Sequence, residues 1–545
     1  MSNFLASHLL WVFAFIACIK IAQAVLKGYR VRKLVHDIPE KYGIPTLPHS
    51  MLWGHLAELG KLMAQYPSDI HGQYMPTLLM KHHPEVCKYD ACYLDLWPVV
   101  PPSIFVFNPD MMRQFCQEPS LPKHDLIQWQ FGSWTQGNDL ALQHGEAWKK
   151  WRSILNPGFS AKNITSLVPA MLEEVLDFRQ CLEGLAATGE TFILEDVATK
   201  LTVDVIGRVA LGVRLKSLTA KNALYTALRN QVSWTATHFS PMGLQKLLNP
   251  MRYYFTWRND RAFRKVCLPG VIAGIESQVP KGASKTMTDL VIAAYTKDCS
   301  TIAPLDPHWL DVVVSQFKIF FFAGHDSTTA TLCFVYAYLN ENPTKLALVR
   351  EEMNLVLGKS GLQDSIAIIS RSPEILSQLT YTTAAIKETL RLQPTVGSVR
   401  QAPEDFFLIH PETGTRLPVH GFMLQSASSA EQRMAKYFPR PHEFIPERFL
   451  AREGEELYVR KNTYRPFELG PRNCIGQEHA MTEIRLILAL TIRDMDIVPQ
   501  YPSDAPPLFG SQLYQESNER EIKAHPRLGL PAKIVLRDQN SRQSA

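Results

Sequence analysis

The strongest chemical signal in the sequence is a short loop around Cys474. It reads Phe467-Glu-Leu-Gly470-Pro-Arg472-Asn-Cys474-Ile-Gly476, and a helical pattern over 477–493 follows at once. A thiolate that binds a metal needs its negative charge stabilised, and the unsatisfied N–H groups at the start of a helix provide this. The two glycines permit a tight turn and the close approach of a flat cofactor. Arg472 offers a cation to an acidic group, and Phe467 excludes water from the sulfur. The alternative is a buried cysteine between turn glycines, beside an ordinary surface arginine.

A second candidate site lies in the middle of a long helical pattern that runs from Pro307 to Asn340. This stretch reads Ala323-Gly324-His325-Asp326-Ser327-Thr328. Hydroxyl side chains at a helix centre go against helix propensity, which suggests that they have a function. Ala323 and Gly324 are small enough for a bound group to come near the helix, and Asp326 beside a hydroxyl can relay protons. The alternative is a Ser/Thr-rich kink packed in a core, and we interpret His325 as a packing or surface residue.

Two weaker patterns involve pairs of side chains on one helix face. Glu388 and Arg391 are three residues apart in the helical run 374–392 and are able to pair. Trp148 and Arg152 are four apart and are able to reach the same acidic group. Taken alone, the first pattern is typical of a solvated salt bridge and the second of an exposed amphipathic helix.

Together these segments resemble the cytochrome P-450 superfamily, and they run in family order from about residue 45 to residue 537. The cysteine loop matches the family's FxxGxRxCxG pattern at every fixed position. Pro446-Glu447-Arg448-Phe449 resembles its PERF element, the helix centre resembles (A/G)Gx(D/E)T(T/S), and the Trp148 segment is similar to its WxxxR helix. One departure is Ser327, which stands where threonine is usual; it keeps the hydroxyl but loses the methyl group that fixes the rotamer.

The resemblance implies roles for individual residues. The cofactor would be haem b (iron protoporphyrin IX), with Cys474 as the ligand of the iron. The expected cofactor-binding residues are Cys474, Arg472, Phe467, Trp148, Arg152, Arg400, Ala323 and Gly324. The expected catalytic residues are Asp326, Ser327 and Thr328, and the choice of proton donor between the two hydroxyls stays open. Glu388, Arg391 and Arg448 would form a buried charge network that braces the loop before the cysteine.

The implied activity is a monooxygenase that inserts one oxygen atom of O2 into a hydrophobic small molecule. The chain as a whole is similar to fungal enzymes of secondary metabolism. No glycine fingerprint for a flavin or nicotinamide occurs, so the electrons would come from a membrane-bound NADPH–cytochrome P-450 reductase. Lys149 and Lys150 are able to offer it a basic docking face. One alternative is a haem-thiolate isomerase or dehydratase without external electrons, and another is an anchored haem-binding or scaffold protein without enzymatic activity.

The N-terminus has the composition of a membrane anchor. From Leu9 to Leu26 the sequence is almost wholly apolar, which is long enough for a spanning helix when Phe4 and Leu5 are included. A basic cluster follows from Lys27, so the rest of the chain would face the cytoplasm at the endoplasmic reticulum. The alternative is a cleaved signal peptide.

The remaining sequence predicts one large, mostly α-helical catalytic domain with small β-sheets, the cytochrome P-450 fold. We expect residues 1–26 to be the anchor, 27–54 a basic and proline-rich linker, and 55–545 the haem-thiolate domain. Strand-like runs occur at 103–107, 405–410 and 533–537. The net charge of +5 is small for 545 residues and no basic run interleaves with aromatics, so we expect no nucleic-acid partner.

Overall fold

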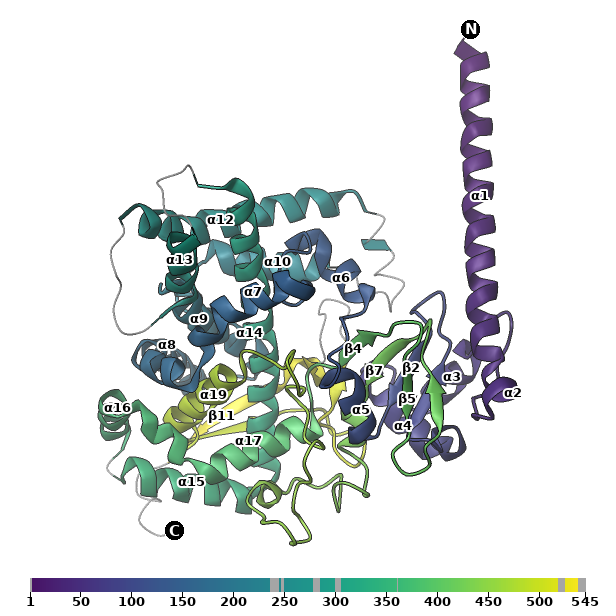
Figure 1. Ribbon diagram of the computed structural model, residues 1–545. Coiled ribbons are helices and arrows are strands. Elements are labelled where there is room, and N and C mark those ends of the chain that lie inside the picture. Colours follow the sequence, from purple (N-terminus) through teal and green to yellow (C-terminus); the bar gives the residue numbers. More distant parts are fainter. Residues whose placement is uncertain are drawn as a thin grey trace. The chain divides into compact units, whose positions relative to one another are not determined.

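The computed structural model describes residues 2–235, 245–246, 249–277, 285–298, 305–359, 361–517 and 525–537. Within these residues the chain is mostly helical with small sheets, as predicted (Figure 1). It divides into two compact units. The first comprises Met1–Ser68, Met75–Pro122 and Ser398–Ala427, and the second comprises Asp69–Tyr74, Lys123–Gly397 and Ser428–Ala545.

The first unit contains the main sheet. Its helices are α1 (Ser2–His36), α2 (Ile38–Tyr42), α3 (Leu56–Met63), α4 (Met75–His82) and α5 (Pro109–Cys116), with a 3-10 turn at Pro84–Cys87. Its strands are β1 (Ala91–Leu94), β2 (Ser103–Val106), β4 (Ser398–Gln401), β5 (Phe407–Ile409), β6 (Arg416–Pro418) and β7 (Met423–Ser426). Four strands pair in the order β1-β2-β7-β4, in which β2 and β7 are parallel and the outer pairs antiparallel. β5 and β6 form a separate antiparallel hairpin.

Helix α1 runs without a break past residue 26 and is fixed to the first unit near its C-terminal end. Arg32 Nη1 donates to Asp95 Oδ1 at 2.5 Å, and Arg32 Nη2 donates to the Trp97 carbonyl at 2.6 Å. His49 Nε2 lies 2.9 Å from the other oxygen of Asp95. The spanning helix expected over residues 1–26 is not confirmed: among the described residues, no helix combines the length and apolar character needed to cross a membrane.

The second unit holds the remaining helices. They are α6 (Asp125–Thr135), α7 (Gly145–Leu155), α8 (Ala161–Thr188), α9 (Leu194–Leu211), α10 (Ala223–Trp234), α12 (Met251–Ser277), α13 (Met287–Asp298), α14 (Pro307–Glu341), α15 (Pro343–Leu357), α16 (Leu362–Arg371), α17 (Thr380–Leu392), α18 (Ser428–Glu431) and α19 (Gln477–Thr491). Short 3-10 turns lie at Gly72–Tyr74, Asn156–Phe159, Pro373–Gln378, Pro446–Phe449 and Arg527–Gly529. The strands β3 (Phe192–Ile193), β11 (Pro531–Leu536) and β8 (Met495–Pro499) form an antiparallel sheet, and β9 (Gln515–Glu516) pairs with β10 (His525–Pro526).

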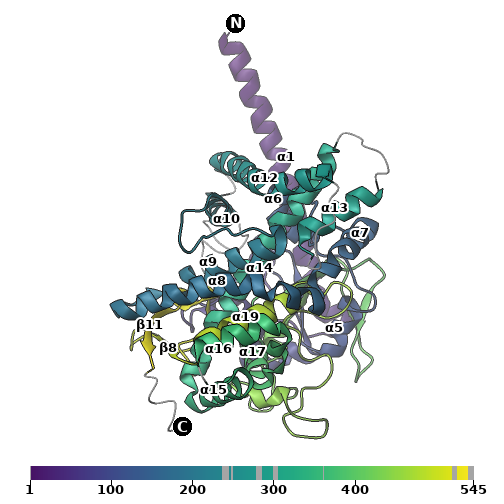
Figure 2. The same cartoon turned by 90° about the vertical axis from the view of Figure 1, so that its left-hand side faces the viewer.

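Helix α14 is the central element of the second unit. Its start is fixed by Asp306, whose side chain accepts from the His308 N–H, and Pro307 occupies the first turn. It ends at Glu341 with Asn342 as its C-cap, because the following Pro343 cannot continue it. α9 packs along it, α17 and α19 contact it, and α8 lies beside α19 (Figure 2). The helix is buried on nearly every side, which explains its continuous apolar sequence.

The helical and strand predictions agree with the structure. α14 covers the predicted 307–340, and α19 and α17 cover most of the predicted 477–493 and 374–392. The predicted strands correspond to β2, β5 and β11. Of the aromatic-rich segment 234–257, residues 236–244 and 247–248 lie outside the described residues. The domain boundaries proposed at residues 26 and 54 stay predictions.

Candidate active site

The cysteine loop is closed on itself by backbone hydrogen bonds. The Cys474 N–H donates to the Phe467 carbonyl at 2.9 Å, and the Asn473 N–H donates to the Gly470 carbonyl at 3.0 Å. Gly470 has a φ of 91°, a conformation that favours glycine, so the predicted tight turn is present. Cys474 is exposed, and α19 begins three residues later at Gln477. The loop therefore holds an accessible sulfur close to the positive end of a helix.

Helix α7 contacts this loop through residues that were expected to bind the cofactor. Arg152 Nη1 and Nη2 donate to the carbonyl and the side-chain oxygen of Asn473, both at 2.9 Å. Arg472 lies over the Trp148 ring, 4.5 Å from its centroid, and donates to the Gln143 carbonyl at 2.9 Å. Burial lowers the pKa of Arg152, and the charge of Cys474 opposes this shift. The structure thus shows these side chains positioning the loop, and their contact with a propionate stays a prediction.

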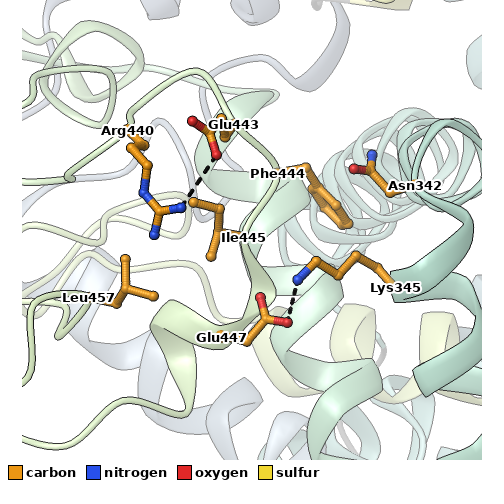
Figure 3. A pocket seen from close by; sticks show the side chains of 8 residues that line it. All are labelled: Asn342, Lys345, Arg440, Glu443, Phe444, Ile445, Glu447 and Leu457. Atoms are coloured by element: carbon orange, nitrogen blue, oxygen red, sulfur yellow. Dashed lines mark hydrogen bonds and ion pairs between the residues drawn. The ribbon is translucent and has the colours of Figure 1, made fainter.

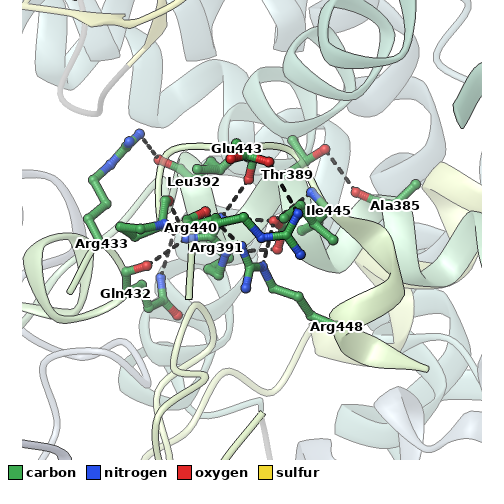
Figure 4. Close-up of polar contacts among 12 residues, drawn as sticks. Ala385, Thr389, Arg391, Leu392, Gln432, Arg433, Arg440, Glu443, Ile445 and Arg448 are labelled. Atoms are coloured by element: carbon green, nitrogen blue, oxygen red, sulfur yellow. Dashed lines mark hydrogen bonds and ion pairs between the residues drawn. The ribbon is translucent and has the colours of Figure 1, made fainter. Parts of the chain in front are cut away.

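A second group of charged side chains forms a buried network that includes Arg391 and Arg448 (Figure 4). Arg391 Nε and Nη2 donate to the two oxygens of Glu388 at 2.7 and 2.8 Å, and Arg448 Nε donates to Glu388 Oε1 at 3.2 Å. All three side chains are fully buried. The Ile445 N–H also donates to Glu388 Oε1, at 2.9 Å. The structure therefore brings together Glu388, Arg391 and Arg448, as the sequence predicted.

Gln432 connects this network to the segment before the cysteine. Its side-chain nitrogen donates to the Arg391 carbonyl at 3.1 Å, while its side-chain oxygen accepts from the Arg465 N–H at 3.0 Å. Arg465 Nε donates to Glu468 at 2.7 Å, directly after Phe467. Phe467 packs against the main core of the second unit. Sequence reasoning drew nothing from Gln432, because an isolated amide gives no spacing signal.

The centre of α14 carries an exposed patch on an otherwise buried helix. Ala323 is exposed and Gly324 and Ser327 are partly exposed, while Phe317–Phe322 and Thr328–Leu339 are buried. Ser327 Oγ donates to the Ala323 carbonyl at 2.8 Å, one turn back along the helix. Gly324 faces α9, where an added Cβ would lie 3.1 Å from Ile206. Asp326 is buried, and its Oδ1 lies 3.3 Å from His525 Nε2.

Arg400 lies in the first unit, on β4. It is fully buried, and its Nη1 donates to the Ser398 hydroxyl and to the Val399 carbonyl. Its Nε and Nη2 have no hydrogen-bond partner among the described residues. Such unsatisfied buried donors carry a substantial cost unless an acceptor is bound. The side chain is therefore suited to an anionic group, and its role as a propionate ligand stays a prediction.

These observations fit the residues to a haem thiolate. A sulfur accessible to a ligand stands at a helix start, and α14 exposes small residues where its neighbours are buried. An added Cβ at Gly476 would lie 3.9 Å from Cys474 Sγ, so the glycine leaves the space beside the sulfur open. When bound, haem with a thiolate ligand supplies the cleavage of the O–O bond. The chain supplies the ligand and the acidic and hydroxyl groups, while a cover of the sulfur by Phe467 stays a prediction.

A separate pocket of about 560 Å³ does not belong to this site (Figure 3). It is lined by Lys345 and Glu447, which pair at 2.5 Å, and by Arg440 and Glu443, which pair at 3.6 Å. Neither the cysteine loop nor the exposed patch of α14 lines it. Its charged side chains pair with one another, and Glu447 Oε2 is left without a hydrogen-bond partner among the described residues.

The comparisons with known proteins show the family of the chain. The family model described as Cytochrome P450 matches residues 72–523. The cytochrome P450 monooxygenase polC of Polytolypa hystricis is 32% identical over 501 residues, covering 91% of this chain and 88% of the relative. The cytochrome P450 monooxygenase acrF of Aspergillus aculeatus is 32% identical over 517 residues, covering 88% and 100%. The corresponding ptmG of Penicillium ochrochloron is 26% identical over 524 residues, covering 93% and 92%. The chain therefore belongs to the cytochrome P-450 family, as a haem-thiolate monooxygenase.

Proposed function

We propose that this monooxygenase hydroxylates a hydrophobic small molecule in a secondary-metabolite pathway, with electrons from an NADPH–cytochrome P-450 reductase. An external electron source is needed, because the sequence contains no flavin or nicotinamide fingerprint. Lys149 and Lys150 are exposed on α7, the helix that grips the cysteine loop, and favour an acidic partner there. The resemblance to fungal secondary metabolism supports the pathway, and the relatives above come from fungi.

The observation that carries the proposed site is the exposed Cys474 at the start of α19, held by hydrogen bonds from α7. From this position the thiolate would be the iron ligand, while Arg152 and Arg472 fix the loop that carries it. On α14, Asp326 would hold the proton that oxygen activation requires. Ser327 is partly exposed and Thr328 is buried, so we assign the hydroxyl next to the substrate to Ser327.

The test of the ligand is the absorption spectrum of the reduced, carbon monoxide-bound holoenzyme. The wild-type protein is expected to give a Soret band far to the red, and Cys474→Ser is expected to lose it. Cys333→Ser is a matched control, because Cys333 is buried on α14 and is expected to leave the band in place. A variant Cys474→Ser that kept the red-shifted band would refute the assignment.

NADPH dependence then separates the proposed reaction from the isomerase alternative. A screen of lipophilic compounds for shifts in the iron's spin state identifies candidate substrates, and turnover of a positive compound is measured with and without NADPH and reductase. We expect turnover to require both. Turnover without them would favour an isomerase or dehydratase.

We also propose that the N-terminal helix attaches the enzyme to the endoplasmic reticulum membrane as a single-pass anchor, with the catalytic part in the cytoplasm. Large apolar side chains of α1 are exposed, among them Trp11 at 75%, Phe15 at 67% and Ile21 at 63%. Exposed apolar surface of this kind favours contact with lipid. Basic residues from Lys27 onward support the cytoplasmic orientation. Retention of full-length protein, but not of a form lacking residues 1–26, in alkali-washed microsomes is the expected result; retention of both would contradict an anchor in this segment.

A further inference from the structure

Three ionisable side chains from distant parts of the second unit meet beside the centre of α14. His525 Nε2, on β10, lies 3.3 Å from Asp326 Oδ1. Its other ring nitrogen, Nδ1, pairs with Oε1 of Glu195 in the first turn of α9. The side chains of His525 and Asp326 are each 2% exposed, whereas Glu195 is 15% exposed. One imidazole therefore bridges an inner carboxyl group and an outer one that reaches solvent.

Packing alone does not explain this arrangement. Burying carboxyl groups and an imidazole costs free energy, and apolar side chains of similar volume are often neutral or stabilising in such places. The inner carboxyl group is Asp326, next in the chain to the partly exposed Ser327. A histidine that holds one carboxyl with each nitrogen can accept a proton on one side and donate on the other. Nδ1 makes a hydrogen bond with Glu195, whereas Nε2 lies at ion-pair distance from Asp326 without hydrogen-bond geometry, so a small rotation of the ring would complete a proton path.

The other charged groups around His525 do not replace it in this role. His71, from the segment before the first 3-10 turn, has a pKa lowered to about 4, first by burial and then by His525. It is therefore uncharged near neutral pH. Burial raises the pKa of Glu516 on β9, which also interacts with Glu195, Asp69 and His525. The direct contacts to Asp326 and Glu195 are made by His525.

We propose that Glu195, His525 and Asp326 conduct protons from solvent to the centre of α14, and that His525 is the positioning residue that holds Asp326. The proposal rests on the role of Asp326 as proton donor. One proton enters at Glu195 and moves to Nδ1 of His525, while the proton on Nε2 passes to Asp326. The imidazole stays neutral and changes tautomer, Asp326 becomes a neutral carboxylic acid, and no oxidant or reductant is consumed. After Asp326 has given up its proton, the ring returns to its first tautomer before the next proton passes. A Glu195 carboxylate with access to water is reprotonated from solvent.

The test compares His525→Gln with the control His71→Gln in holoenzyme that receives electrons from NADPH through the reductase. Glutamine keeps a hydrogen-bonding side chain but cannot transfer a proton between two sites. We expect the control to resemble wild type. In His525→Gln, with a compound that shifts the spin state, we expect organic product per NADPH to fall at least about tenfold, hydrogen peroxide to rise, and the solvent deuterium isotope effect to increase. An unchanged product yield and isotope effect in His525→Gln would overturn the proposal.

A second measurement does not depend on activity. The melting temperatures of holoenzyme carrying Glu195→Gln, His525→Gln or both are compared in a double-variant cycle. If the two side chains pair as in the structure, the double variant is expected to melt close to His525→Gln, short of the sum of the single shifts. Additive shifts would overturn the pairing.

Asp326→Asn separates failure of this proposal from failure of the proposed function. All variants are first required to keep the red-shifted carbon monoxide band. If Asp326→Asn loses product formation and His525→Gln does not, the path through His525 is overturned while Asp326 remains the donor. If Asp326→Asn retains full product formation, the donor assignment and the path are both overturned.

Discussion

The two sides of the candidate site are built on opposite electrostatic principles. Around Cys474 the polar partners are arginines, whose charge does not change in the physiological pH range. Around the centre of α14 they are carboxyl groups and a histidine, which exchange protons readily. The ligand side is therefore fixed in charge and in position, whereas the helix side is able to change its protonation. A reaction that needs a constant ligand and a supply of protons requires this division.

The largest effect on stability is expected from a substitution of Glu388, in the buried charge network on the ligand side. Glu388→Gln leaves Arg391 and Arg448 buried with insufficient negative charge, which is expected to cost about 3–5 kcal/mol of stability and much of the haem content. The measurements are the urea unfolding midpoint and the size of the carbon monoxide band. The matched control is Glu146→Gln, which removes an exposed pair with Lys149 and is expected to cost less than about 1 kcal/mol. Equal losses in both variants would show that the buried network does not brace the fold.

A smaller effect is expected from pH on the helix side, at Asp139. Burial raises its pKa to about 6, although Thr135 and the N–H groups of Ala141 and Leu142 donate to its carboxyl group. The adjoining Leu140 N–H donates to Gln316 of α14 at 2.9 Å, so the loop is tied to that helix. A folded-state pKa above the unfolded value gives stability that is present below about pH 4 and is lost as the pH rises through about 6.

Asp139→Asn isolates this pH dependence from that of the other carboxyl groups. Between pH 4 and pH 7 the wild type is expected to lose about 3 kcal/mol of unfolding free energy relative to the variant. Urea unfolding of the holoenzyme at a series of pH values measures it. A difference independent of pH would mean that the buried carboxyl group does not titrate in this range.

The smallest expected effect distinguishes the two hydroxyls of α14. Ser327→Ala is expected to lower product per NADPH about tenfold, because it removes the partly exposed hydroxyl beside Asp326. Thr328→Val preserves the shape of a buried side chain and is expected to change the yield little. The reverse result would move the donor from Ser327 to Thr328.

The sequence was informative where partners are close in the chain. The cysteine loop lies within ten residues, and Glu388 pairs with Arg391 through a three-residue helical spacing, so pattern and contact coincide. The length of α14 followed from a helical pattern that runs from Pro307 to Asn340, whereas its cap at Asp306 was not predicted. The partner of Asp326 was not predictable, because His525 is a single histidine without a motif and lies far from Asp326 in the chain. Pairings of this range are set by the folded topology alone.

Most of the hydrogen bonds from the Arg391 guanidinium go to backbone carbonyl oxygens. Besides Glu388, it donates to the carbonyl oxygens of Gln432, Pro441 and Glu443 at 2.7, 2.8 and 3.1 Å. These acceptors are present whatever side chains those positions carry. These contacts with Arg391 therefore depend on the backbone path of residues 432–443 and not on the side chains that the segment carries. Lysine has three donors against the five of arginine and cannot bind all of these carbonyl oxygens together. Substitution is therefore tolerated at the acceptor positions but not at Arg391.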